Sequence, residues 1–429
     1  MLFLSPRFSA ACALSHAARV CLPILLLVPV AVLAGPPPLT LGEATELAVE
    51  RAPMLQARRA GISAAQQEAA RAGALPDPTL LVGIDNLPVT GTDAFDFSAD
   101  DMTMKRIGLR QEIPARAKRE ARRTLAARGI DEAQALSAAQ QLTVRRAAAE
   151  AWIDLWAAQR ELVSLQALRD QAALAAKLAK ARVAGGDALV TDALAAQAAV
   201  LELDNRIEGL RSSQFAAQAG LARWLGDTEI ETTTDTPDFT ALPVPEARLL
   251  SAIDQLGPLL PVTAQVESAA AAIDVARAEK RPDWSVGASY GQRAGGRSDM
   301  ILVEIGIGLP LFTRNRQDRG VAAREADYQG ALAGREDVRR QQIAQIRADV
   351  ARWEGLKRQV ALHEASLLPL ANDRSAVALA AYRAGGNIQS WLDAQRDELN
   401  IHLSHAEHLG ELGRAWAALA YLLPSETQP

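Results

Sequence analysis

The sequence is poor in cysteine and in aromatic residues, and it has no excess of basic charge. Only Cys12 and Cys21 are cysteines among 429 residues, and both lie in the first segment of the chain. Aromatic residues make up 4% of the chain, and its formal net charge is −5. Removal of the first segment would leave no thiol, which excludes disulfides, thiolate metal sites and a cysteine nucleophile. The acidic balance argues against a nucleic-acid partner, because such proteins carry a basic patch.

What the sequence does contain is alanine. Hydrophobic residues make up 49% of the chain, and alanine, leucine and valine supply most of them. A sequence rich in alanine, glutamine, glutamate and arginine favours long, closely packed helices over a bulky globular core. No Ser/His/Asp constellation, phosphate loop or zinc motif is visible, so we expect neither an enzyme nor a cofactor.

The N-terminal segment is typical of a secretory signal peptide. Residues 1–34 contain two arginines and no acidic residue, and an apolar run over 21–34 ends in small residues. The run is short for a membrane span, although a membrane anchor is the alternative. Gly35 follows where a lipoprotein would have cysteine, so we expect cleavage near Ala34 without lipidation. No later stretch is expected to form a transmembrane helix.

The rest of the chain is an internal repeat. Three pairs of short segments correspond at one constant offset: 107–109 with 305–307, 196–197 with 394–395, and 219–222 with 417–420. We therefore predict a first repeat over 35–226, a linker rich in Thr, Pro and Asp over 227–246, a second repeat over 247–424 and a tail over 425–429.

Each repeat is predicted to contain a helix, two strands and a long helical hairpin. The fold class is therefore mainly α with a small β part. The predicted strands are 79–87 and 102–113, then 283–291 and 300–310. The predicted hairpins are 115–225 with its tip at 184–187, and 315–423 with its tip at 384–387.

The helical prediction depends on spacing. From Ala193 to Trp224, apolar residues recur at intervals of three and four, which is a coiled-coil seam. The stretch of about 115–183 lacks proline and could reach about 100 Å as one helix. A plain structural coiled coil would explain this much.

The predicted strands point elsewhere. Apolar residues alternate with small or polar ones over 284–291 and 301–309, and Glu304 would face a lumen. Each strand has about the 9–11 residues that a tilted strand needs to cross an outer membrane. Four strands cannot close a barrel, so two or three copies would have to share one. An ordinary hairpin packed on a helix is the alternative.

The chain resembles the TolC family of outer-membrane efflux channels. The matching segments are 39–44 (LTLGEA), 75–78 (LPDP), 382–386 (YRAGG) and 392–395 (LDAQ). The stretch 85–114 makes it most similar to heavy-metal efflux components of the CzcC and CusC type. The resemblance implies a homotrimer, with a 12-stranded barrel in outer-membrane lipid on a periplasmic coiled-coil α-barrel. It also implies two partners, a periplasmic adaptor protein and an inner-membrane RND pump.

The resemblance also implies site residues at the hairpin tips. Gly185, Gly186, Gly385 and Gly386 would meet the adaptor, although glycines there also simply end helices.

Four charged residues near the tips are candidates for a gate. By resemblance, Asp192 and Asp393 would ring the closed tunnel mouth, and Arg182 and Arg383 would pair with them. Close carboxylates repel one another and attract cations. Solvated helix charges are the alternative.

His402, His405 and His408 lie one turn apart on the last helix, with Glu398 and Glu411 nearby. Such spacing is a weak indication of a metal site, and ordinary solvated or hydrogen-bonded histidines are the alternative.

We therefore expect a passive outer-membrane conduit, located in the cell outer membrane with a long periplasmic extension, that exports heavy-metal cations. A multidrug or type I secretion channel and a soluble periplasmic coiled-coil protein remain alternatives, because the pump chooses the cargo.

Overall fold

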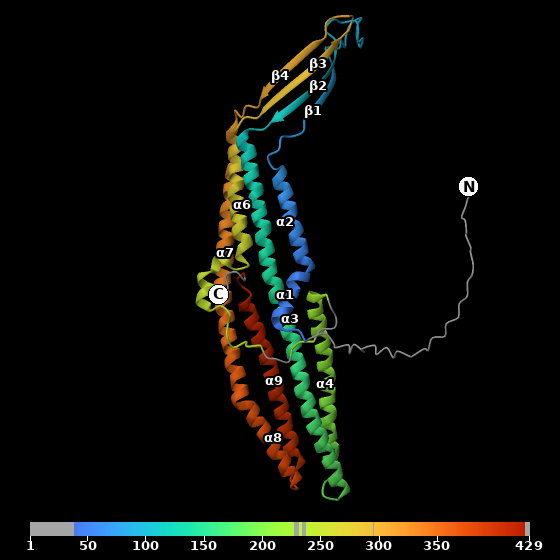
Figure 1. Ribbon diagram of the computed structural model, residues 1–429, viewed down its shortest axis with the longest axis vertical. Coiled ribbons are helices and arrows are strands. Elements are labelled where there is room, and N and C mark those ends of the chain that lie inside the picture. Colours follow the sequence, from blue (N-terminus) through green and yellow to red (C-terminus); the bar gives the residue numbers. More distant parts are fainter. Residues whose placement is uncertain (1–37, 227–230, 234–236, 295, 425–429) are drawn as a thin grey trace, which may run out of the picture. The chain divides into compact units, whose positions relative to one another are not determined.

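Long helices and one four-stranded sheet make up the computed structural model, which describes residues 38–226, 231–233, 237–294 and 296–424 (Figure 1). The predicted signal peptide, part of the predicted linker and the tail over 425–429 lie outside these residues.

The first half begins with two consecutive helices, α1 (Leu41–Arg51) and α2 (Pro53–Arg71). Thr40 and Glu43 cap α1 reciprocally, each side chain bonding the other residue's backbone N–H. The elements that follow are β1 (Thr79–Asp85), β2 (Met104–Ile113), α3 (Arg116–Ala184) and α4 (Val190–Leu225). Helix α3 runs unbroken for 69 residues, which corresponds to about 100 Å.

The second half has the same order of elements. They are α5 (Glu246–Ser251), η1 (Ile253–Gln255), α6 (Leu259–Ala278), β3 (Trp284–Arg293), β4 (Met300–Ile307), η2 (Thr313–Asn315), α7 (Gln317–Leu362), η3 (His363–Leu367), α8 (Leu368–Arg383) and α9 (Ile388–Ala420).

The long helix of the second half is interrupted, which the sequence analysis did not predict. The segment η3 is π-helical, and Pro369 follows it at the start of α8. Proline has no N–H to donate to the carbonyl of Ala365 and its ring crowds that carbonyl, so the regular helix cannot continue through this point.

The helices bury two apolar clusters. One surrounds Trp152, Trp156 and Phe239, and the other contains Tyr382 and Trp391 with residues of α3 and α4. Along the predicted seam of α4, four side chains are buried: Ala196, Leu203, Ile207 and Leu221. The seam therefore packs as its spacing indicated, with α4 lying against α3.

Helix α6 is the exception, by length and composition only, to the expectation that no later stretch resembles a transmembrane helix. Among the described residues it alone is long and apolar enough to cross a membrane, with a mean hydropathy of 1.2. Core helices can pass the same test, and α6 packs along α3 and α7.

The four strands form one antiparallel sheet in the order β1-β2-β3-β4 (Figure 1). The register places Leu80, Leu109, Ala288 and Val303 in one row across the sheet. Within the part of the chain that the structure describes, β1 and β4 each pair on one side only. The sheet therefore ends in two open edges.

Candidate functional site

One face of the sheet is apolar and exposed. Val82, Ile107, Tyr290 and Ile301 lie side by side in the register, and each side chain is exposed. Ile301 is 79% exposed and Val82 74%, values that large aliphatic residues rarely reach over a whole sheet face in water. In one chain, therefore, this apolar face is not buried by packing against other elements, as one face of a soluble sheet ordinarily is.

The opposite face carries small and charged residues. Arg110 lies across Gly287 from Glu304, with Arg110 Nη2 3.3 Å from Glu304 Oε2. A methyl group added at Gly108 would lie 2.4 Å from Ser289 Cβ, so this face is crowded. Glu304 thus lies on the face opposite the exposed apolar one, as the alternation indicated.

A buried lysine joins the sheet to α3. Lys118 Nζ lies 2.7 Å from Asp283 Oδ2 and 3.3 Å from Glu279 Oε2, and Asp283 also accepts a hydrogen bond from the Ala115 N–H. Burial alone would raise the pKa of Asp283, but the hydrogen bonds from Lys118 and Ala115 outweigh burial and leave that pKa lowered. The carboxylate therefore stays ionised at the junction.

The glycines of the two tips differ in what they require. Gly186 (φ +81°) and Gly385 (φ +101°) have left-handed backbones that other residues rarely adopt. A side chain at Gly386 would meet the Ala381 carbonyl oxygen at 2.8 Å, whereas one at Gly185 would make only ordinary contacts. Three of the four predicted tip glycines are thus required by backbone geometry, independently of any partner.

Arg182 links the two tips within one chain. Its guanidinium lies 4.6 Å from the centre of the Tyr382 ring, and Nη1 donates to the Tyr382 carbonyl at 2.8 Å. Nη1 and Nη2 also approach the carbonyls of Gly386 and Asp187, at 3.4 and 3.1 Å. No local pattern in the sequence indicates the role of Tyr382, because its partner lies 200 positions away.

The predicted acid–arginine pairs are not formed within the described part of one chain. Asp192 lies in the first turn of α4, where an acid suits the helix dipole. Asp393 accepts a hydrogen bond from Gln389 and lies 3.6 Å from Arg396. Arg182 donates hydrogen bonds to backbone carbonyls instead, and Arg383 is exposed. Pairing between neighbouring chains stays a prediction.

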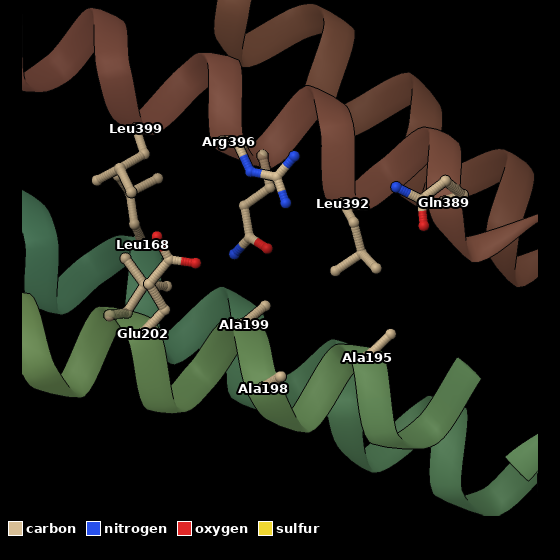
Figure 2. A pocket seen from close by; sticks show the side chains of 11 residues that line it. Leu168, Ala195, Ala198, Ala199, Glu202, Gln389, Leu392, Arg396 and Leu399 are labelled. Carbon is tan, nitrogen blue, oxygen red and sulfur yellow. The ribbon is translucent and has the colours of Figure 1, made fainter. Parts of the chain in front are cut away.

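A groove of about 260 Å³ separates α4 from α9 near the tips. Figure 2 shows Leu392 and Leu399 of α9 pointing toward α4, which contributes Ala195, Ala198 and Ala199. The volume lies below the roughly 300–1,000 Å³ of small-molecule sites, so the groove is better suited to side-chain packing than to a ligand.

The predicted histidines separate into two groups. His402 Nε2 lies 3.4 Å from Asn372 Oδ1 of α8. His405 and His408 face His363, which the sequence analysis missed, with ring centres 6.0 and 5.1 Å away. No group of three His, Cys, Asp or Glu side chains in the described ranges could hold a metal ion. The predicted histidines 402, 405 and 408 therefore do not form a shared metal site.

Known proteins resemble this chain in sequence and in fold. The chain is 29% identical over 313 residues to the cobalt-zinc-cadmium resistance protein CzcC of Cupriavidus metallidurans, covering 70% of this chain and 72% of that protein. The crystal structure of the outer membrane protein VceC from Vibrio cholerae superposes with a TM-score of 0.72 at 19% identity, covering 89% of this chain and 96% of that one. CusC, described as undergoing transmembrane channel formation, gives a TM-score of 0.75 at 14% identity, covering 90% and 92%.

The family model described as "Outer membrane efflux protein" matches residues 44–227 and 258–424, which is most of the chain. The chain therefore belongs to the outer membrane efflux protein family.

Proposed function

We propose that the protein is the outer-membrane channel of a tripartite efflux system, a homotrimer that conducts heavy-metal cations passively to the exterior. The observation that carries this proposal is the sheet, which combines an exposed apolar face with two unpaired edges.

The edges require other copies. In lipid, each unsatisfied backbone group is destabilising by several kcal/mol, so an open four-stranded sheet cannot stand alone there. Three copies would supply twelve strands, with the apolar face toward lipid and the face bearing Arg110 and Glu304 toward a lumen. The crowding at Gly108 supports this arrangement, since the inner side of a curled sheet has least room.

The hairpin tips are the proposed contact with a periplasmic adaptor, which would connect the channel to an inner-membrane pump. Gly185 supports this role, because its position is exposed and its backbone does not itself require glycine.

Heavy-metal cations are the proposed cargo because the relative CzcC is named for resistance to cobalt, zinc and cadmium. On the proposed lumen face Glu304 is paired with Arg110, which suits a conduit whose pump selects the cargo.

Fractionation and a deletion strain test the proposal. We expect the protein in outer-membrane fractions as a heat-modifiable trimer, and we expect the deletion strain to become sensitive to zinc, cobalt or cadmium. A monomer that remains in the periplasmic fraction would contradict the channel, and sensitivity to drugs alone would contradict the cargo.

A further inference from the structure

We propose that the groove between α3, α8 and α9 contains a binding site for one divalent transition-metal cation. Its ligands are the Glu398 carboxylate and the His402 imidazole of α9, supported by the Asn372 and Ser375 oxygens of α8. The site deepens the proposed function, because it would give the exported cation a resting place on the helical part of the channel. All four side chains line one groove.

Glu398 is the strongest indication of a ligand. The residue is 4% exposed, and its Oε2 atom is buried without a hydrogen-bond partner among the described residues. Ser375 is its hydrogen-bond partner, and no charged neighbour of Glu398 is found in the described ranges. A buried carboxylate without a counter-charge is unfavourable. A bound cation would remove that penalty.

His402 is the proposed second ligand, and it lines the same groove as Glu398. It follows Glu398 by four residues on α9, so both side chains lie on the same face of the helix. Its Nε2 atom lies 3.4 Å from Asn372 Oδ1, which brings α8 to the same place. Burial, followed by the neighbouring His405, lowers the pKa of His402. An imidazole binds metal ions through a ring nitrogen in its neutral form.

The facing helix completes the set with oxygen atoms. Asn372 and Ser375 are three residues apart on α8 and so project from one face. Helix α3 contributes only uncharged side chains to the groove, and the one cationic lining residue, Arg383, is exposed. Nothing charged on the lining therefore competes from α3 for the Glu398 carboxylate.

The ligand types indicate the class of cation. An imidazole nitrogen with a carboxylate oxygen suits zinc, cobalt and similar ions, whereas magnesium prefers oxygen ligands alone. Only two of the four ligands are strong ones, so the site should release its ion readily. That property distinguishes it from a closed structural zinc site, which uses four strong ligands.

Equilibrium dialysis of the purified full-length protein against zinc or cobalt chloride tests the site, with magnesium chloride as a control. We expect one zinc or cobalt ion per chain and no retained magnesium. Glu398→Gln and His402→Ala should each weaken zinc binding at least tenfold. The matched control is the double variant Glu364→Gln, His405→Ala. It removes a neighbouring Glu–His pair, whose atoms lie 3.5 Å apart, and should bind as the wild type does.

Absent zinc binding by the wild type, or unchanged binding by Glu398→Gln and His402→Ala, would overturn the site. Equal loss in the control would overturn its location. Should Glu398→Gln fail to fold, Asn372→Asp decides, because an added carboxylate must strengthen zinc binding, and unchanged or weaker binding contradicts the proposal.

Metal resistance is measured separately in the complemented deletion strain. A chain that restores resistance but retains no zinc in dialysis contradicts the site and leaves the proposed channel function standing. A chain that binds zinc but restores no resistance contradicts the function and leaves the site standing.

Discussion

The guanidinium of Arg182 lies 4.6 Å from the centre of the Tyr382 ring and donates a hydrogen bond to the carbonyl of the same residue. Tyr382 is 1% exposed, so the arginine covers an aromatic side chain at the end of the second hairpin. One residue of the first hairpin thus fixes the position of the second.

Replacement of Arg182 should loosen the tips. The stacking and the carbonyl hydrogen bonds together contribute on the order of 1–2 kcal/mol, so Arg182→Ala should raise the resting conductance in planar bilayers about tenfold. Arg182→Lys should raise it nearly as much, because an ammonium group does not stack as a planar guanidinium does. Tyr382→Phe is the control, since the Tyr382 hydroxyl has no hydrogen-bond partner among the described residues. Unchanged conductance of Arg182→Ala would contradict this role.

The tip glycines allow backbone geometry and partner contact to be tested separately. Gly185→Trp should leave the tip folded, because its φ is ordinary and it has room, yet it should reduce cross-linking to the adaptor. At Gly385, Asn should be tolerated and Val should disturb the turn, because the backbone there is left-handed. Full adaptor cross-linking by Gly185→Trp would argue against an adaptor surface at this tip.

The crowded face of the sheet should tolerate no added methyl group at Gly108. Gly108→Ala places Cβ within 3 Å of three atoms of Ala288 and Ser289, two of them backbone atoms, which should be destabilising by about 1–3 kcal/mol. Gly83→Ala, on the same face, has open space and should behave as the wild type. The measurement is the temperature at which the oligomer dissociates in denaturing gels. Equal midpoints for both variants would show that the face is not crowded.

Asp283 should make stability depend on pH in the acidic range. Its pKa is lowered in the folded chain, so its contribution is present above the unfolded value of about 4 and is lost as pH falls through the folded value. Asp283→Asn should therefore lower the dissociation temperature at pH 7, and the difference from wild type should shrink at pH 3. The side chain is 45% exposed, so the effect should be modest.

Asp77→Asn is the matched control for this prediction. Asp77 follows Pro76 shortly before β1, as Asp283 follows Pro282 directly before β3, and Asp77 is exposed. A pH-independent difference for Asp283→Asn, or an equal effect of Asp77→Asn, would contradict the assignment.

Much of the fold follows from local patterns in the sequence. The lack of proline predicts the long helix α3. Spacing predicts the seam of α4 and the alternation that separates Glu304 from the apolar face. These features depend on residues close together in the chain, so periodicity is sufficient to find them.

The site residues were harder to predict because their partners are distant in the sequence. Arg182 meets Tyr382 across 200 positions, and His402 meets Asn372 across a turn between helices. The charge of Arg182 suggested a carboxylate partner, but the free carbonyls at the end of a helix compete for the same donors. The break at His363 has a local signal in the sequence, because Pro369 follows it and proline interrupts a regular helix.

Disulfide cross-linking between β1 and β4 tests the central claim most directly. Because the cysteines lie only at positions 12 and 21, cleavage near Ala34 would leave none to interfere. Each variant carries two introduced cysteines, one in β1 (at Leu80, Val82 or Ile84) and one in β4 (at Ile301, Val303 or Ile305). Isolated outer membranes are then treated with an oxidant so that neighbouring cysteines form disulfides. The account predicts that at least one pair yields a covalent trimer in denaturing gels. Monomers from every pair, or a covalent dimer as the largest product, would contradict it.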